Sequence, residues 1–219
     1  MKKYTAEDLK GFEKNEEGWI MCPAGDYTEI KSFPEGCSFG EDCRFGDNCR
    51  FGEWCHFGEG GRFGEYCRFG AECRFGAGCS FGAGCRFGEE CHFGAICEFE
   101  DGGSFGAGCS FGAGCSFGKR CSFGENCRFG AECRFEGGHI AAPGYPMLTF
   151  GGFGSANRTT YAFNCKDGVV IRCECFSGSL EEFREKVRER HGNTPLAIEY
   201  LAIADLIERR FSREGEVRR

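Results

Sequence analysis

The chain has 219 residues, a length that fits one ordinary domain or two small ones. It contains 25 Phe and 37 Gly but only 6 Tyr and 2 Trp, which points to a repeated unit rather than a mixed core. The net charge of −7, from 34 acidic and 27 basic residues, disfavours a protein that grips phosphates through a basic surface. Direct binding of nucleic acid is therefore not expected.

The N-terminal stretch MKKYTAEDLKGFEKNEEG lacks the apolar segment of a secretory signal. No apolar run reaches the length of about 18 residues that suggests a membrane span. These features predict a cytoplasmic protein with no membrane contact. A resemblance described below implies that the cell is a bacterial host. With 19 Cys and no export signal, the thiols are expected to be reduced.

Residues 1–32 precede the repeat and are predicted to form an N-terminal cap. A short helix is expected over residues 6–14, and Trp19, Ile20 and Met21 are expected to cover the open end of the repeat. Such a cap is needed because an uncapped solenoid exposes its core and stacks on itself.

Phe recurs every six residues from Phe33 to Phe135, eighteen times without a phase error. Cys lies four residues after Phe in fifteen repeats, and Gly61 and Gly103 interrupt that series. A period of six would scatter the Phe side chains around a helix, but it suits a short strand followed by a corner. In Cys-x-Phe the outer two side chains point to one side of the strand and the middle one to the other.

Hexapeptides such as FGEDCR, FGAGCS and FGENCR resemble those of the hexapeptide-repeat left-handed parallel β-helix family. Here Phe replaces the aliphatic residue of that family, and Cys is its small residue. The resemblance covers residues 33–138 and implies three hexapeptides per coil. The expected fold class is mainly β, a three-sided single-stranded parallel β-helix of about six coils.

The residue between Cys and Phe is predicted to face solvent, and the corners carry most of the acids. Trp54 and Tyr66 interrupt this polar pattern at corner positions. Exposed aromatic residues among charges are common interface anchors, although a merely solvated surface with weak ion pairs is the alternative. The candidate binding residues are Arg50, Glu53, Trp54, His56, Glu65, Tyr66, Arg68, Arg74 and His92.

Catalysis and metal binding are not expected. Many members of the β-helix family are acyltransferases, but His56 and His92 would lie on an open face without the cleft and orienting partner of a general base. Outside the repeat, Cys173-x-Cys175 together with Cys22 and Cys165 is the alternative zinc site, but its spacing departs from the usual zinc pattern, and strand residues facing a core are favoured. We therefore predict no catalytic residues, no metal and no cofactor.

Residues 139–158 are predicted to be a cap and linker, and residues 159–219 a ββαα module. The two strands are expected to join through a three-residue loop, Lys166 to Gly168, which pairs Phe163 with Ile171. Ser179-Leu-Glu-Glu forms a capping box at the start of a helix that ends at Gly192, and Thr194-Pro195 opens a second helix. Its apolar stripe would pair within the chain or across a homodimer.

The pattern F-x-C-x-x-G-V-x-I-R-C-E-C-F-S-G-S-L-x-x-F, from Phe163 to Phe183, is similar to segments of uncharacterised phage and prophage proteins. This resemblance implies a protein of a mobile element. Together the features predict a non-enzymatic protein-binding β-solenoid that inhibits a host protein, with a nucleic-acid-handling defence enzyme as the candidate partner. A self-assembling scaffold similar to bactofilins and a hexapeptide-type acyltransferase are the alternatives.

Overall fold

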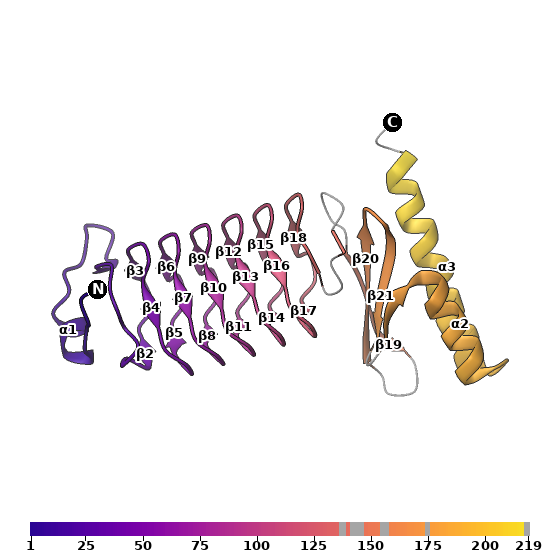
Figure 1. Cartoon of the computed structure of the whole chain (residues 1–219), viewed down its shortest axis with the longest axis horizontal. Helices are drawn as coiled ribbons and strands as arrows, with labels where there is room; N and C mark the ends of the chain where they lie inside the picture. Colours follow the sequence, from indigo (N-terminus) through magenta and orange to yellow (C-terminus); the bar gives the residue numbers. More distant parts are fainter. Residues whose placement is uncertain (136–138, 141–146, 154–157, 174–175, 217–219) are drawn as a thin grey trace. The chain divides into compact units, whose positions relative to one another are not determined.

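The computed structural model describes residues 1–135, 139–140, 147–153, 158–173 and 176–216, in two compact units. The first unit lies within Met1–Gly138, and the second is built mainly from residues 146–219 (Figure 1). No helix in these described ranges is both long enough and apolar enough to cross a membrane.

The first unit is a parallel β-solenoid of about six coils, which confirms the predicted fold class. Strands pair with strands 18 residues away, so that Phe81 pairs with both Phe63 and Phe99. Sheet A contains β4 (Arg44–Phe45), β7 (Arg62–Phe63), β10 (Ser80–Phe81), β13 (Glu98–Phe99) and β16 (Ser116–Phe117). Sheet B contains β1 (Ile20–Cys22), β3 (Cys37–Phe39), β6 (His56–Phe57), β9 (Arg74–Phe75), β12 (His92–Phe93), β15 (Ser110–Phe111) and β18 (Arg128–Phe129). Sheet C contains β2 (Ser32–Phe33), β5 (Arg50–Phe51), β8 (Arg68–Phe69), β11 (Arg86–Phe87), β14 (Ser104–Phe105) and β17 (Ser122–Phe123).

The interior of the solenoid is a stack of Phe rings. Phe81 lies nearly parallel to Phe63 and Phe99, with ring centroids 4.7 and 4.9 Å apart. It also meets Phe75 and Phe87, the Phe residues of the adjoining repeats, edge to face at 5.1 and 5.0 Å. Offset-stacked and edge-to-face arrangements are the two favourable geometries for aromatic pairs. Each coil therefore gains both kinds of contact only when another coil lies against it.

The Gly and Cys of each repeat make this close stacking possible. A Cβ atom on Gly88 would lie 2.6 Å from the backbone nitrogen of Ala71 in the neighbouring coil, so no side chain fits there. The Cys thiols are buried, and most of them donate to a carbonyl of the coil before, usually that of a glycine, as Cys85 Sγ does to Gly64 at 3.3 Å. Cys thus fills a small site and also gives a buried carbonyl a partner.

The N-terminal segment closes the first coil with two tyrosines. Tyr27 stacks on Phe45 at 5.5 Å, and Tyr4 stacks on Tyr27 at 4.9 Å, which continues the ring column of sheet A. Helix α1 (Ala6–Lys10) is shorter than predicted, because the chain leaves the helix at Gly11. Met21 does not cover the rings, since it is exposed on β1 in register with the outward Ser38, whereas Ile20 is half-buried in register with the inward Cys37.

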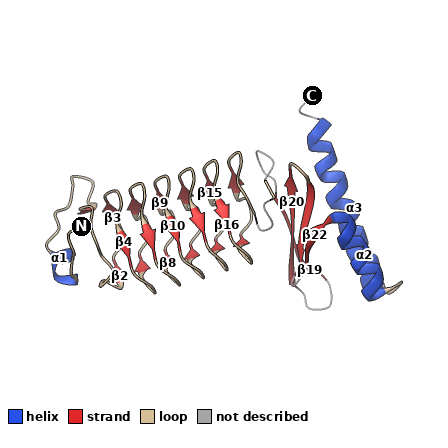
Figure 2. Ribbon diagram, in the orientation of Figure 1, coloured by secondary structure: helices blue, strands red, loops and turns tan. Residues whose placement is uncertain are grey.

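The second unit has four antiparallel strands and two helices (Figure 2). Its strands form sheet D, in the order β19 (Met147–Phe153), β20 (Arg158–Cys165), β21 (Gly168–Cys173) and β22 (Phe176–Ser179). Helix α2 (Leu180–His191) begins with the predicted capping box, and α3 (Pro195–Glu216) follows. An α+β module is thus confirmed, but β19 lies within the segment predicted as a linker, and β22 was not predicted.

The predicted hairpin register is wrong by one residue. Cys165 pairs with Gly168 across a two-residue loop, so that Phe163 faces Val170 and Ala162 faces Ile171. Ala162 and Ile171 belong to the core formed with the helices, whereas Phe163 and Val170 are buried on the other face of the sheet. Because both faces carry apolar residues, the hydrophobic pattern does not select one register.

We expect Phe81→Ala to lower the free energy of unfolding of the solenoid by about 3–5 kcal/mol, because it removes a buried ring from the middle of the stack. Urea denaturation followed by circular dichroism measures this change. Ser80→Ala, on the outward side of the same strand, is the matched control and is expected to have little effect. Equal stability of the two variants would contradict the importance of ring stacking.

Candidate functional site

The third residue after each Phe turns the corner in a left-handed backbone conformation. Glycine occupies seven of these corners, at positions 36, 60, 78, 84, 102, 108 and 114. Ten others carry side chains at φ between 53° and 61°, and Trp54, Tyr66 and Ile96 are the large apolar ones among them. Bulky or β-branched residues rarely adopt this conformation, so these three positions are strained.

Burial of the side chain does not offset the backbone strain at these three residues. Trp54 is 46% exposed, Tyr66 57% and Ile96 65%. A left-handed backbone costs a residue with a Cβ atom about 1–2 kcal/mol. Residues kept at such a cost without a core contact are candidates for contact with a partner. Trp54 and Tyr66 were predicted as binding residues, and the repeat itself could have revealed Ile96, since it stands where Gly78 and Gly114 stand in adjacent coils.

Sheet C carries a ladder of arginines on its outward side. Arg50 is in register with Arg68, and Arg68 with Arg86, so the three side chains lie in one column. All three are exposed. Within the described part of the chain, none of their guanidinium groups has an ion pair or a hydrogen bond. We call this column the arginine ladder.

Tyr66 borders the arginine ladder at the corner that leads into β8. Its ring lies against Gly84, where an added Cβ atom would be only 2.5 Å from Cδ1 of the tyrosine. Together with Asn48, these residues and the ladder line a hollow of about 140 Å³. Arg86, Asn48 and Gly84 were not among the predicted site residues, although the 18-residue coil places Arg86 in the column of Arg50 and Arg68.

The predicted binding residues divide between two faces of the solenoid. Arg50, Arg68, Glu65 and Tyr66 belong to sheet C and one of its borders. Glu53 and Trp54 follow β5, at the corner between sheets C and B. The remaining three, His56, Arg74 and His92, form an outward column on sheet B.

The two histidines of sheet B have different environments. Trp19 stacks on the imidazole of His56, with ring centroids 4.1 Å apart, so the N-terminal segment partly covers this side chain. The exposed His92 has its Nδ1 atom 2.8 Å from the backbone carbonyl of Glu90. Neither ring is paired with a carboxylate in the described structure, so this column lacks the oriented acid–base pair typical of general-base catalysis.

The described cysteines outside the repeat are separate structural thiols. Burial, followed by the charge of Asp167, raises the pKa of Cys165 to about 12. Cys173 accepts a hydrogen bond from Thr160 Oγ1 at 3.1 Å, and Cys22 is buried. Among the described residues no group of three or more His, Cys, Asp or Glu side chains forms a metal site. Cys175, the second member of the Cys-x-Cys pair, lies outside those residues.

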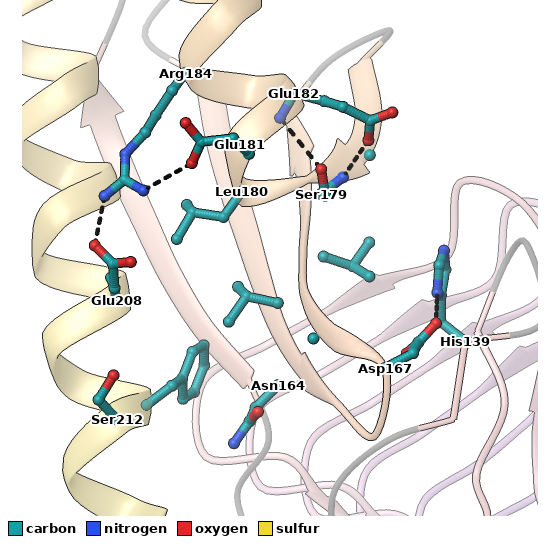
Figure 3. A pocket seen from close by; sticks show the side chains of 15 residues that line it. His139, Asn164, Asp167, Ser179, Leu180, Glu181, Glu182, Arg184, Glu208 and Ser212 are labelled. Carbon is teal, nitrogen blue, oxygen red and sulfur yellow. Dashed lines mark hydrogen bonds and ion pairs between the residues drawn. The ribbon is translucent and has the colours of Figure 1, made fainter.

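The second unit contains a hollow of about 550 Å³ beside α2 and α3 (Figure 3). Its polar side chains are largely paired with one another. Arg184 bonds Glu208 at 2.7 Å, and His139 Nδ1 lies 2.7 Å from Asp167 Oδ2, a hydrogen bond that lowers the pKa of this aspartate. The Ser179–Glu182 capping box closes the start of α2 at the same hollow. This hollow was not predicted from the sequence.

One known family matches parts of the chain, the RNA-binding, Nab2-type zinc finger. The matched segments are residues 31–46, 42–58, 62–76, 66–82, 79–94, 104–118, 109–124 and 120–135. No curated protein and no solved structure matches the chain significantly.

The solenoid gives a physical reason why the zinc-finger pattern matches without forming zinc sites. A finger of this kind needs both Cys and His, but six of the eight matched segments contain no His. Where a His is present, as in Cys55-His56-Phe57, the thiol is buried and the imidazole lies on the outward side of the strand. A single metal ion cannot bind both side chains there. We infer that the match follows the regular spacing of Cys.

We expect Ile96→Gly to raise the free energy of unfolding of the solenoid by about 1 kcal/mol, because it relieves a left-handed β-branched residue. Ile198→Gly is the matched control, since Ile198 is equally exposed, at 65%, but lies in helix α3. There the same change is expected to be destabilising. Chemical denaturation of each variant tests this, and destabilisation by Ile96→Gly would contradict the assigned strain.

Burial lowers the pKa of His56 below its ordinary value of 6.5, and the charge of Arg74 lowers it further. The unfolded chain therefore takes up this proton at a higher pH than the folded chain. As the pH falls through about 6.5, proton uptake favours unfolding, so stability decreases. We expect His56→Ser to make the thermal midpoint less sensitive to pH between about 7 and 5. If the thermal midpoint of the variant depends on pH as that of the wild type does, the partly buried environment of His56 beside Arg74 is contradicted.

Proposed function

We propose that this chain is a non-enzymatic binding protein whose solenoid presents sheet C, with its arginine ladder and aromatic borders, to a partner protein. The observation that carries the proposal is the placement of Trp54 and Tyr66. Both side chains are exposed, both have a strained backbone, and they stand at the two borders of the same sheet. Aromatic and arginine side chains are the residue types most enriched at the energetic centres of protein interfaces.

The rigidity of the solenoid supports this function. The ring columns are continuous from the tyrosine cap to Phe135, and each coil is bonded to its neighbours through backbone hydrogen bonds. A surface held in this way loses little conformational entropy on binding. A partner would therefore meet a fixed spacing of charged and aromatic groups, as an inhibitor that covers a functional surface requires.

The biological role that we propose is inhibition of a host protein by a phage- or prophage-encoded factor, with a nucleic-acid-handling defence enzyme as the candidate target. This part of the proposal rests on the expectation drawn above from the Phe163–Phe183 sequence; no curated protein matches the chain significantly. RNA binding through zinc fingers is not proposed, because the thiols of the matched segments are buried in the core. Open end-to-end polymerisation is disfavoured at the N-terminal end, where Tyr4 and Tyr27 cover the first coil.

The test is capture of host proteins from a bacterial lysate by the tagged chain and by variants that copy residues of the same corner column. Tyr66→Asn copies Asn48, and Trp54→Glu copies Glu72, so both keep corners that the solenoid already tolerates. We expect one stoichiometric host protein to be retained by the wild type and lost with either variant, because each removes an interface anchor.

The control for this capture is Arg62→Ser on the outward side of sheet A, which copies Ser80 of its own column and lies outside sheet C. It is expected to retain the partner. Loss of the partner with Arg62→Ser but not with Tyr66→Asn would place the interface on another face. Self-association of the wild type as the sole result would contradict the inhibitor and favour a scaffold.

A further inference from the structure

We infer that the segment recognised by sheet C is an acidic α-helix that lies along the solenoid axis, across the strands. This inference rests on the proposed binding function and names the chemistry of its partner. Its basis is the combination of an unpaired arginine ladder, the spacing of the ladder, the acids that border it and the adjacent tyrosine ring.

The arginine ladder places like charges side by side without compensation from the described chain. Arg50, Arg68 and Arg86 stand on adjacent strands in register, which is an unfavourable arrangement for like charges. Although acids occupy both bordering corners, none comes within ion-pair distance of the three guanidinium groups in the described structure. A ligand that brings carboxylates to this column would relieve the repulsion and gain charge-assisted hydrogen bonds.

The spacing of the ladder favours a helix over an extended chain. Adjacent strands are about 4.8 Å apart, so the ladder spans about 9.6 Å over two steps. Acids at positions i, i+3 and i+7 of a helix rise by about 4.5 and 10.5 Å, close to both ladder distances. Alternate side chains of an extended strand are about 6.7 Å apart and reach about 13 Å over two steps. An acidic helical stripe therefore fits the column better than an acidic strand does.

The borders of sheet C restrict the ligand to a narrow negative stripe. The border with Tyr66 carries Asp47 and Glu65, and the border with Trp54 carries Glu53, Glu72, Glu89 and Glu90. All six are exposed. A uniformly negative polymer such as nucleic acid would meet repulsion on both sides of the ladder. A helix with a central acidic stripe and basic flanks would be complementary to the column and to both borders.

Tyr66 supplies an apolar contact beside the ladder. Its ring rests on Gly84 and forms one wall of the hollow that the three arginines also line. A tyrosine in this position offers a large contact area with few rotatable bonds to immobilise. An apolar side chain of the helix, next to its acidic stripe, would fill the hollow.

The experiment measures binding of two labelled helical peptides by fluorescence anisotropy at low ionic strength. One has Glu at the first and fourth positions of each heptad, which gives the spacing i, i+3 and i+7, with Lys on both flanks and Ala elsewhere. The other distributes the same residues around the helix. We expect saturable binding of the striped peptide and at least about threefold weaker binding of the isomer, because only the stripe satisfies the ladder.

Arg68→Ser tests the ladder itself and copies Ser104 and Ser122 of the same column. It is expected to weaken binding of the striped peptide by about threefold to fivefold. Arg62→Ser on sheet A is the matched control, since it removes the same charge, copies Ser80 of its own column and is expected to leave binding unchanged. Circular dichroism verifies that both variants retain the fold.

Three results would overturn the inference. They are equal binding of the two peptides, equal effects of Arg68→Ser and Arg62→Ser, or tighter binding of single-stranded DNA than of the striped peptide. The proposed binding function can hold even if this inference fails. If the chain still captures a host protein in a manner that depends on Tyr66, but neither peptide binds, the acidic helix is wrong and the proposed interface remains.

Discussion

Stacking of phenylalanine rings at an 18-residue repeat is the interaction on which the rest of the solenoid depends. A strand of two or three residues cannot bury a ring by itself, and each Phe is covered only by rings of the neighbouring coils and repeats. This need explains the constant phase of six, since a residue inserted within a strand would turn the ring of that strand to the outside. It also explains the tyrosine cap, because the first ring layer needs aromatic cover of the same kind.

The close stacking also determines which residues can accompany Phe. Gly follows it because the next coil passes too near for a side chain, as the 2.6 Å approach at Gly88 shows. Cys occupies the small inner site and donates to a partly buried carbonyl such as that of Gly64, which a purely apolar residue of similar size cannot do. The chemistry of these thiols is therefore structural, and their regular spacing produces a zinc-finger pattern in a protein whose described residues form no metal cluster.

Sequence reasoning recovers the solenoid well because its period is long, unbroken and physically specific. The number of coils, the inward Phe and Cys, and the outward column that contains Arg50 and Arg68 all follow from the 18-residue coil. Sequence reasoning fails where two structures, such as two strand registers, satisfy the same hydrophobic pattern. Sheet D has apolar residues on both faces, so alternation could not fix the register of Phe163. The stacking of Trp19 on His56 depends on the path of the cap, which no repeat specifies.

Different positions of each hexapeptide determine the fold and the character of the surface. Three positions, the Phe, the following Gly and the Cys, hold the coils together, while the outward position and two corner positions vary freely among the described coils. Ser, Arg and His exchange at the outward position without change of register. A surface of this kind can acquire an arginine ladder in one part of a column and carry serine further along it, as at Ser104 and Ser122, with little effect on stability. Residues that do carry a cost, such as a tyrosine in a left-handed corner, are therefore the positions on which the proposed binding function rests.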